Sequence, residues 1–335
     1  MKKVFKLGLA VCASLTLSSL AACSSDKQQT TSSSSEAKTI DFILDWSPNT
    51  NHTGLYVAKE LGYFEEAGVN VDIKLPPEDS SSDLVINGKA PFAIYFQDSM
   101  AKKLEKGAGI TAVAAIIEHN TSGIISAGSA NVANPKDLEG KKYGTWNDPV
   151  ELAILTTLLK DQGGDFEKVE KVPNTESNSV TPIANSMFDA AWIYQGWDGI
   201  MAEREGMDTN FFYLRDYASE FDYYSPVIIA NNDYLAQNPE EAKKVLAAIK
   251  KGYQYAIKYP EESAKILIKN APELQSQEEF VLASQKYLSG QYASDPEKWG
   301  QFDAKRWNAF YKWANENGIL ENDLKDKGFS NEYIN

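Results

Sequence analysis

Cysteine is nearly absent from this sequence of 335 residues, and both copies, Cys12 and Cys23, lie among the first 23 positions. The rest of the chain has no thiol, which excludes a catalytic cysteine, redox chemistry and disulfides there. Histidine is as scarce, with only His52 and His119. So few nitrogen and sulfur ligands argue against a transition-metal site. We therefore expect neither a metal ion nor a cofactor.

Positive charge is also in short supply. The sequence has 33 lysines and arginines against 47 acidic residues, which gives a formal net charge of −14. Lys2, Lys3 and Lys6 are the only charged residues of the N-terminal stretch, so its removal would take the charge from −14 to −17. A body this acidic is poorly suited to bind nucleic acid or, by itself, an anionic membrane.

No apolar run reaches the roughly 20 residues that a membrane-spanning helix needs. The nearest candidate follows MKKVFK; it is short and rich in serine, and it ends in LAAC with the cysteine at Cys23. A basic start, an apolar core and small residues at the end are typical of a signal peptide. Because LAAC resembles the bacterial lipobox, we predict a lipoprotein signal peptide over residues 1–22 and a lipid on Cys23. An ordinary secretory signal or a short membrane anchor is the alternative.

The segment after this cysteine, within residues 23–38, reads SSDKQQTTSSSSEAK and has almost no apolar side chain. Such a segment cannot offset the entropy lost on ordering, so we expect a flexible tether. The body that follows, residues 39–335, is close to 300 residues long. That length favours two lobes over a single core.

Within the body, short apolar runs alternate with helical segments, which predicts an α/β fold with mostly parallel sheets between helices. The expected strands are the runs near residues 40–44, 69–75, 90–96, 110–120 and 141–146, and the later runs VEKV, AAWIY and FFYLR. The pattern restarts near residue 141 and turns helical toward the end. We predict lobe I from residues 39–127 and 222–335, and lobe II from residues 128–221.

Aromatic and amide side chains gather where the predicted strands end. The clearest case is DWSPNTNHTGLYVAKELGYF, Asp45 to Phe64, directly after the first strand. Ligands of open α/β sheets bind beyond the carboxyl ends of the strands, where such loops meet. The sequence therefore predicts a ligand cleft between the two lobes.

Five stretches carry a resemblance to a known family: LDWSPNTNHTGLYVAKELGYFEEAGVNV, EHNTSG, GKKYGTW, AWIYQGWDG and DYYSPVI. In order, and over nearly all of the body, they resemble the thiamine-precursor binding proteins of bacterial ABC importers. The wider family includes fungal thiamine-pyrimidine synthases and, more distantly, taurine- and nitrate-binding components. The resemblance implies a two-lobed periplasmic-binding-protein fold of type II, placed outside the cytoplasm, that closes on 4-amino-2-methylpyrimidine compounds. The partners it implies are a membrane permease and its ATPase, with a monomer as the default expectation.

An aminopyrimidine is a flat ring with acceptors and an exocyclic amine, so its site needs aromatic faces and a carboxylate or amide at the edge. We expect Trp46 to stack on the ring and Asn49 to hydrogen-bond it, with His52 as a further candidate. The alternatives are that Trp46 belongs to the core, that Asn49 caps the following helix and that His52 only begins this helix.

Glu151 has two possible roles. Asp148, Pro149 and Glu151 fit a helix start with a capping box, which would account for the glutamate completely. The resemblance adds that a Pro-x-Glu turn stands at the matching position of the importers. Glu151 is therefore also a candidate acceptor for the exocyclic amine.

Further aromatic residues are candidates for the cleft. Trp192 and Tyr194 are two apart on a strand and share a face, and they lie near its carboxyl end, so at least one should face the cleft. Tyr95, at the end of the third strand, and Tyr223, at the return crossing between lobes, are also candidates for the cleft. For each, the alternative is that the ring is packed inside the protein. At the first crossing, residues 119–122 are expected to make hinge hydrogen bonds.

Two other functions are weighed against a carrier. The fungal synthases consume one of their own histidines and carry a cysteine-rich cluster linked to iron. This chain has no such cluster, and Asp98 stands where the histidine is expected, so we assign no catalytic residue. A carrier of sulfonate, nitrate or another heteroaromatic is the second rival. Small anions call for arginine, and Arg204, Arg215 and Arg306 all lie outside the cleft motifs.

Overall fold

A computed structural model describes residues 39–77, 80–176 and 178–335. The predicted signal peptide (1–22), the predicted lipidation site Cys23 and the predicted tether (23–38) lie outside these residues. Within the described ranges, no helix is both long and apolar enough to cross a membrane.

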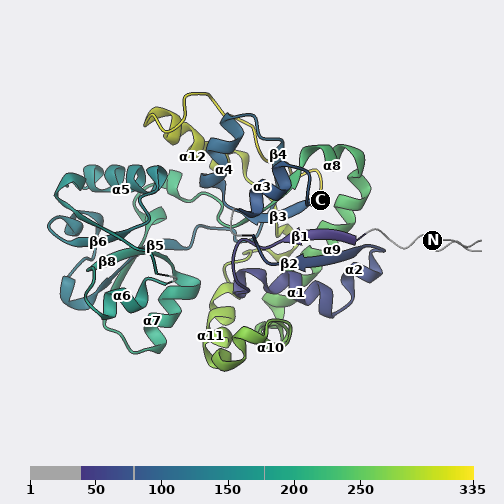
Figure 1. Cartoon of the computed structure of the whole chain (residues 1–335), viewed down its shortest axis with the longest axis horizontal. Coiled ribbons are helices and arrows are strands. Elements are labelled where there is room, and N and C mark those ends of the chain that lie inside the picture. The colour runs from purple at the N-terminus through teal and green to yellow at the C-terminus, as the bar shows by residue number, and fades with distance from the viewer. Residues whose placement is uncertain (1–38, 78–79, 177) are drawn as a thin grey trace, which may run out of the picture. The chain divides into compact units, whose positions relative to one another are not determined.

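Two five-stranded sheets organise the described chain (Figure 1). The first has the order β2 (Asn70–Lys74), β1 (Thr39–Ile43), β3 (Phe92–Tyr95), β10 (Val227–Asn231), β4 (Ile110–Ala115). The second has the order β7 (Glu170–Pro173), β6 (Lys142–Thr145), β8 (Ala190–Tyr194), β5 (Ser122–Ala127), β9 (Thr209–Tyr213). In each sheet one strand, β10 or β5, runs antiparallel to both neighbours and the other four are parallel. The predicted α/β fold with mostly parallel sheets is confirmed.

Helices flank both sheets (Figure 1). Those that accompany the first sheet are α1 (Thr53–Glu60), α2 (Tyr63–Glu66), α3 (Ser81–Ile86), α4 (Gln97–Glu105), α8 (Asn232–Gln237), α9 (Pro239–Lys258), α10 (Pro260–Asn270), α11 (Glu278–Ser289) and α12 (Ala304–Glu316). Those that accompany the second are α5 (Pro149–Asp161), α6 (Val180–Ala184) and α7 (Ile200–Arg204). Each sheet with its helices forms one lobe of the predicted two-lobed fold.

The chain enters lobe II earlier than the sequence indicated. β5 (Ser122–Ala127) pairs with β8 and β9, so the second sheet begins at Ser122 and not after the expected boundary at residue 128. The segment SGIISA is rich in small residues and has no clear alternation, so only its strand pairing reveals which sheet it joins. The chain returns to the first sheet between the end of β9 and the start of β10.

Two glycines allow α1 and α9 to pack closely together next to the first strand-to-helix connection. A Cβ atom on Gly252 of α9 would lie 2.0 Å from the carbonyl oxygen of Gly54, and one on Gly54 would lie 2.3 Å from the ring of Tyr253. Larger residues would therefore push α1 and α9 apart. The Tyr253 hydroxyl also donates to the carbonyl oxygen of Asn51 at 2.6 Å. This contact holds the turn before α1 in place.

The two crossings between the lobes are tied together by Asp222. Its carboxylate lies 2.6 Å from Nδ1 of His119, accepts from the backbone N–H of Asn120 at 2.9 Å and pairs with the Arg306 guanidinium at 3.2 Å. Burial opposes ionisation of Asp222, but the His119 hydrogen bond and the Arg306 charge outweigh it and lower the pKa of the carboxyl. The hinge hydrogen bonds expected of residues 119–122 are confirmed.

Candidate ligand-binding site

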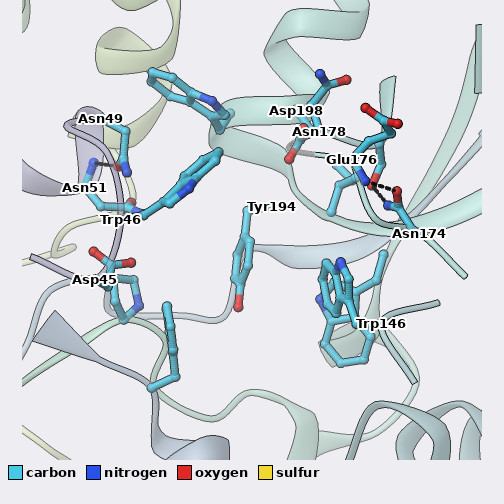
Figure 2. Close-up of a pocket in the computed structure, with 16 residues that line it drawn as sticks. Asp45, Trp46, Asn49, Asn51, Trp146, Asn174, Glu176, Asn178, Tyr194 and Asp198 are labelled. Atoms are coloured by element: carbon cyan, nitrogen blue, oxygen red, sulfur yellow. Dashed lines mark hydrogen bonds between the residues drawn. The ribbon is translucent and has the colours of Figure 1, made fainter. Parts of the chain in front are cut away.

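A cavity of about 310 Å³ lies where loops of both lobes meet (Figure 2). Its walls come from the loops after β1, β3, β6 and β7, the end of β8, the one-turn π-helix η5 (Gln195–Gly199), and the start of β10. The lining residues are Asp45, Trp46, Asn49, Asn51, Phe96, Trp146, Asn174, Glu176, Asn178, Ser179, Trp192, Ile193, Tyr194, Trp197, Asp198 and Pro226. The carboxyl ends of parallel strands thus supply most of the wall, as the α/β architecture predicts.

Aromatic rings dominate the walls. Trp46 of lobe I and Trp146 of lobe II remain 45% and 51% exposed, and Figure 2 shows Tyr194 between them. Trp192 is only 4% exposed and lies behind Trp146, with the ring centroids 6.3 Å apart. Its indole N–H has no hydrogen-bond partner among the described residues. The cavity therefore offers exposed ring faces and one unused buried donor, a combination suited to a flat ligand with an acceptor.

The loop after β1 is pinned by its own amide groups. Asn49 caps the short 3-10 helix η1 (Thr50–His52), because its Oδ1 accepts from the backbone N–H of Asn51 at 2.8 Å. Its Nδ2 donates to the carbonyl oxygen of Ser47 at 3.1 Å. Asn49 both caps and lines the cavity, so one Nδ2 hydrogen is left for another acceptor.

His52 is fully buried and does not line the cavity. Its Nδ1 accepts from the backbone N–H of Asn49 at 3.2 Å, so the neutral ring carries its proton on Nε2. That Nε2 donates to Oδ1 of Asp45 at 2.6 Å. His52 therefore orients Asp45, a cavity residue, and makes no wall contact of its own.

The wall contributed by lobe II is acidic and rich in amides. Asn174, Glu176 and Asn178 come from the loop after β7, and Asp198 from η5. Burial raises the pKa of Asp198 to about 6, and a hydrogen bond from the backbone N–H of Ser179 offsets part of this effect. With Asp45 and Glu176, three carboxyl groups line the cavity, and none of the described lining residues is Lys, Arg or His. Such a wall favours neutral or cationic ligands with N–H donors over anions.

Glu151 lies outside the cavity wall. Its carboxylate accepts from the hydroxyls of Tyr143 and Thr145 at 2.8 and 2.9 Å and from the backbone N–H groups of Trp146 and Asp148 at 3.4 and 3.3 Å. Together with Asp148 it forms the capping box at the start of α5. The structure thus shows the capping role, through which Glu151 holds the backbone of the cavity residue Trp146.

Tyr95 and Tyr223 also lie off the wall. Phe96 directly follows β3 in an extended conformation and lines the cavity. Because neighbouring side chains alternate in extended chain, Tyr95 points elsewhere, with its ring centroid 5.9 Å from the Lys103 ammonium. Tyr223 is buried against Phe310, with ring centroids 4.5 Å apart.

Of the eight ligand-binding candidates, Trp46, Asn49, Trp192 and Tyr194 line the cavity, and His52, Tyr95, Glu151 and Tyr223 do not. The sequence reasoning missed Trp146, Trp197, Asp198 and the loop after β7. The segment NTESNS in that loop carried the same signal as the first turn, namely amide side chains directly after a strand. In the described part of the chain, no three potential metal ligands converge.

Most of the chain is similar in sequence to proteins of known name. The chain is 28% identical to the formylaminopyrimidine-binding protein of Halalkalibacterium halodurans over 309 residues, 90% of this chain and 91% of that protein. It is 25% identical to the 4-amino-5-hydroxymethyl-2-methylpyrimidine phosphate synthase THI11 of Saccharomyces cerevisiae over 70% of this chain and 72% of that one.

Among solved structures, the fold resembles the alkanesulfonate-binding protein SsuA from Xanthomonas axonopodis pv. citri bound to MOPS. The TM-score is 0.67 at 12% identity, covering 87% of this chain and 98% of that one. Residues 49–263, more than half of the chain, match the family described as NMT1/THI5 like. This chain therefore belongs to the NMT1/THI5-like family.

Proposed function

We propose that this protein is the substrate-binding lipoprotein of an ABC importer for a thiamine precursor that contains a 4-amino-2-methylpyrimidine ring. It captures the ligand outside the cytoplasm by closing its lobes, and it delivers the ligand to a permease driven by an ATPase. One observation carries the proposal: among the described residues, the cavity combines exposed tryptophans from both lobes with three carboxyl groups and no basic side chain. The relative named as a formylaminopyrimidine-binding protein supports the same ligand class.

In this proposal each wall has a role. Trp46 and Trp146 stack on the faces of the ring, and Tyr194 borders it. The unpartnered Trp192 N–H donates to a ring nitrogen or to an oxygen of the ring substituent. Asp198 accepts from the exocyclic amine. The ligand thus contacts both lobes, and its binding stabilises the closed arrangement.

The location is argued from the N-terminal sequence. A basic start, a short apolar core and LAAC support export and a lipid on Cys23. The serine-rich tether would let the body reach roughly 20 Å from the membrane by random-coil scaling.

Two rival functions fit the cavity less well. A sulfonate or nitrate carrier needs positive charge around its ligand, and the only charged side chains among the described lining residues are carboxylates. A synthase like the yeast relative is disfavoured because the chain after Cys23 has no cysteine. Asp98, which stands where the synthase histidine is expected, lies in the first turn of α4 and off the cavity wall, and burial raises the pKa of its carboxyl to about 6.

The test is a thermal-unfolding panel with hydroxymethylpyrimidine, formylaminopyrimidine, thiamine, taurine and nitrate. A ligand at 100 times its Kd adds about 2.7 kcal/mol to the free energy of unfolding, which is readily seen as a shift in Tm. We expect a shift with at least one pyrimidine and none with the anions. A response to taurine or nitrate alone would leave the fold assignment intact and reject the pyrimidine.

A further inference from the structure

Helix α11 (Glu278–Ser289) belongs to the C-terminal part of lobe I, yet it lies behind both walls of the cavity. It contacts η1 of lobe I and both η5 and α7 of lobe II, and Figure 1 shows it next to α7. Its apolar side chains join the core of lobe I, to which Ile200 at the start of α7 also belongs. Lobe II is therefore linked to lobe I here as well as through the two crossings.

One buried hydroxyl on α11 joins the two walls directly. The Ser284 side chain is fully buried, and its Oγ donates to the carbonyl oxygen of Gly196 in η5. The Oγ1 of Thr50 in η1 lies 2.6 Å from the same Ser284 oxygen. Since the Ser284 proton is already donated to Gly196, Thr50 must be the donor to Ser284. A single hydrogen-bond chain thus runs from Thr50 through Ser284 to Gly196.

The residues joined by this chain are next to the cavity residues without lining the cavity themselves. Thr50 stands between Asn49 and Asn51, and Gly196 directly precedes Trp197 and Asp198. A displacement of either Thr50 or Gly196 would move the neighbouring wall. Ser284 is therefore in a position to set the spacing between the two walls.

Side chains pack tightly around the hydrogen-bond chain from Thr50 to Gly196 and leave these residues little freedom to move. A Cβ atom on Gly196 would lie 2.7 Å from Cδ2 of Leu288, so η5 lies directly on α11. Trp197 meets Phe280 of α11 edge to face, with centroids 4.6 Å apart. On the other side, the Tyr292 hydroxyl donates to the carbonyl oxygen of Thr50 at 2.5 Å.

We propose that Ser284 is a positioning residue for ligand binding, which holds the η1 and η5 walls at the spacing that the ligand requires. The inference rests on the proposed function, because it concerns the ligand of this cavity. Without the hydroxyl chain the two walls move independently, so the binding-competent arrangement is less populated. The apparent Kd rises in inverse proportion to that population.

The test compares variants that remove or keep a hydroxyl. Ser284→Ala and Thr50→Val break the chain, and Thr50→Ser keeps it. Ser263→Ala is the control for removing a buried hydroxyl, because Ser263 is another fully buried serine, on α10 and off the cavity wall, whose Oγ has no partner among the described residues. For each protein, the Kd and dissociation rate of formylaminopyrimidine are measured by calorimetry and stopped flow. Hydrogen exchange of residues 50–52 and 195–199 is followed in the ligand-free protein.

We expect Ser284→Ala and Thr50→Val each to raise the Kd about tenfold, mainly through faster dissociation, and to speed exchange in both segments. The double variant should be no worse than either single one, since both break the same chain. Thr50→Ser and Ser263→Ala should stay within about twofold of the wild type. A Kd for Ser284→Ala equal to that of Ser263→Ala, or faster exchange in only one segment, would overturn the proposal.

The outcome also separates this inference from the proposed function. If the wild-type protein does not bind formylaminopyrimidine, the proposed ligand is wrong, and the exchange data alone decide the role of Ser284. Joint loss of protection in both segments then upholds the link between the walls, and its absence rejects the link.

Discussion

Trp46 and Trp146 are the residues on which ligand recognition depends most in the proposed function. Each leaves about half of a large apolar ring in contact with water, and each follows a strand of a different lobe. A folded core would normally cover such rings. A flat ligand that covers both gains the burial of their faces and a stacking contribution of about 0.5–1.5 kcal/mol per pair.

Replacing either ring should therefore weaken binding with little effect on folding. We expect Trp46→Ala and Trp146→Ala each to raise the Kd for formylaminopyrimidine at least tenfold, which corresponds to about 1.4 kcal/mol. Because both side chains are largely exposed, Tm should change little. Tyr259→Ala, at an exposed ring that directly follows α9 and does not line the cavity, is the control and should bind as the wild type does. Unchanged affinity in both tryptophan variants would refute the stacking assignment.

Asp198 gives the site a predicted pH dependence. Its pKa is raised by burial to about 6, so the carboxyl is ionised at pH 7 and protonated as pH falls through 6. Only the carboxylate accepts fully from an exocyclic amine. Affinity should therefore be highest above pH 7 and fall several-fold by pH 5.

The control is Asp198→Asn, measured over the same pH range by calorimetry. The variant lacks the titrating group, so the ratio of its Kd to that of the wild type should shrink toward one as pH falls. A ratio that stays constant from pH 5 to 8 would show that Asp198 does not hold the amine. Dividing by the variant also cancels any protonation of the ligand itself.

The residue scale also shows where sequence reasoning about the site stops. That aromatic and amide side chains gather at strand ends could be predicted, and Trp46, Asn49, Trp192 and Tyr194 do line the cavity. Which residue of a neighbouring pair such as Tyr95 and Phe96 faces the cavity could not be predicted, because this depends on the residue at which the strand ends. Asp45 could not be predicted for a different reason, because its side chain is oriented by a hydrogen bond with the buried His52.

At the scale of single elements, the start of α5 is the best example of local sequence fixing local structure. Asp148, Pro149 and Glu151 predicted a capped helix, and the structure has that cap, with Oδ1 of Asp148 accepting from the backbone N–H of Val150 at 2.8 Å. The Glu151 carboxylate is fully used by four donors inside the protein. It therefore has no free acceptor for a ligand.

Variants at this cap should reduce stability more than affinity. We expect Asp148→Ala to lower the free energy of unfolding by about 1 kcal/mol, as for other N-caps. Glu151→Gln should cost about 1–3 kcal/mol, because an amide NH₂ would face donors. Both should bind formylaminopyrimidine within about threefold of the wild type, as judged by chemical denaturation and calorimetry. A large loss of affinity in Glu151→Gln alone would return Glu151 to the ligand site.

Other elements were less accessible from sequence. Strands with strong apolar runs, such as β3 and β4, could be placed directly, whereas β5 (Ser122–Ala127) could not. Its role as the central antiparallel link between β8 and β9 depends on long-range pairing, which no local pattern specifies. The contact of α11 with both lobes is of the same kind, since it joins residues about 90 and 230 positions apart.

At the scale of the whole molecule, charge is the dominant feature. The chain carries a net charge of −14, and three of its carboxyl groups line the cavity with no basic side chain among the described lining residues. Such a field attracts cations and repels anions over distances comparable with the Debye length, about 10 Å at 0.1 M salt. In the proposed function, this field would add to the selectivity against anionic solutes that the contacts of the ligand provide.

A matched pair of ligands can isolate this effect. Aminomethylpyrimidine carries an ammonium group at neutral pH, and formylaminopyrimidine is the same molecule with that nitrogen formylated and neutral. Raising the salt concentration from 0.05 to 0.5 M should raise the Kd of the aminomethyl compound about fivefold or more, because screening shortens the reach of the acidic field. The Kd of the formylated compound should change by less than twofold in the same calorimetric titrations. An equal change for both ligands would mean that salt acts on lobe closure, and a change for neither would mean that the acidic surface plays no part in selecting the ligand.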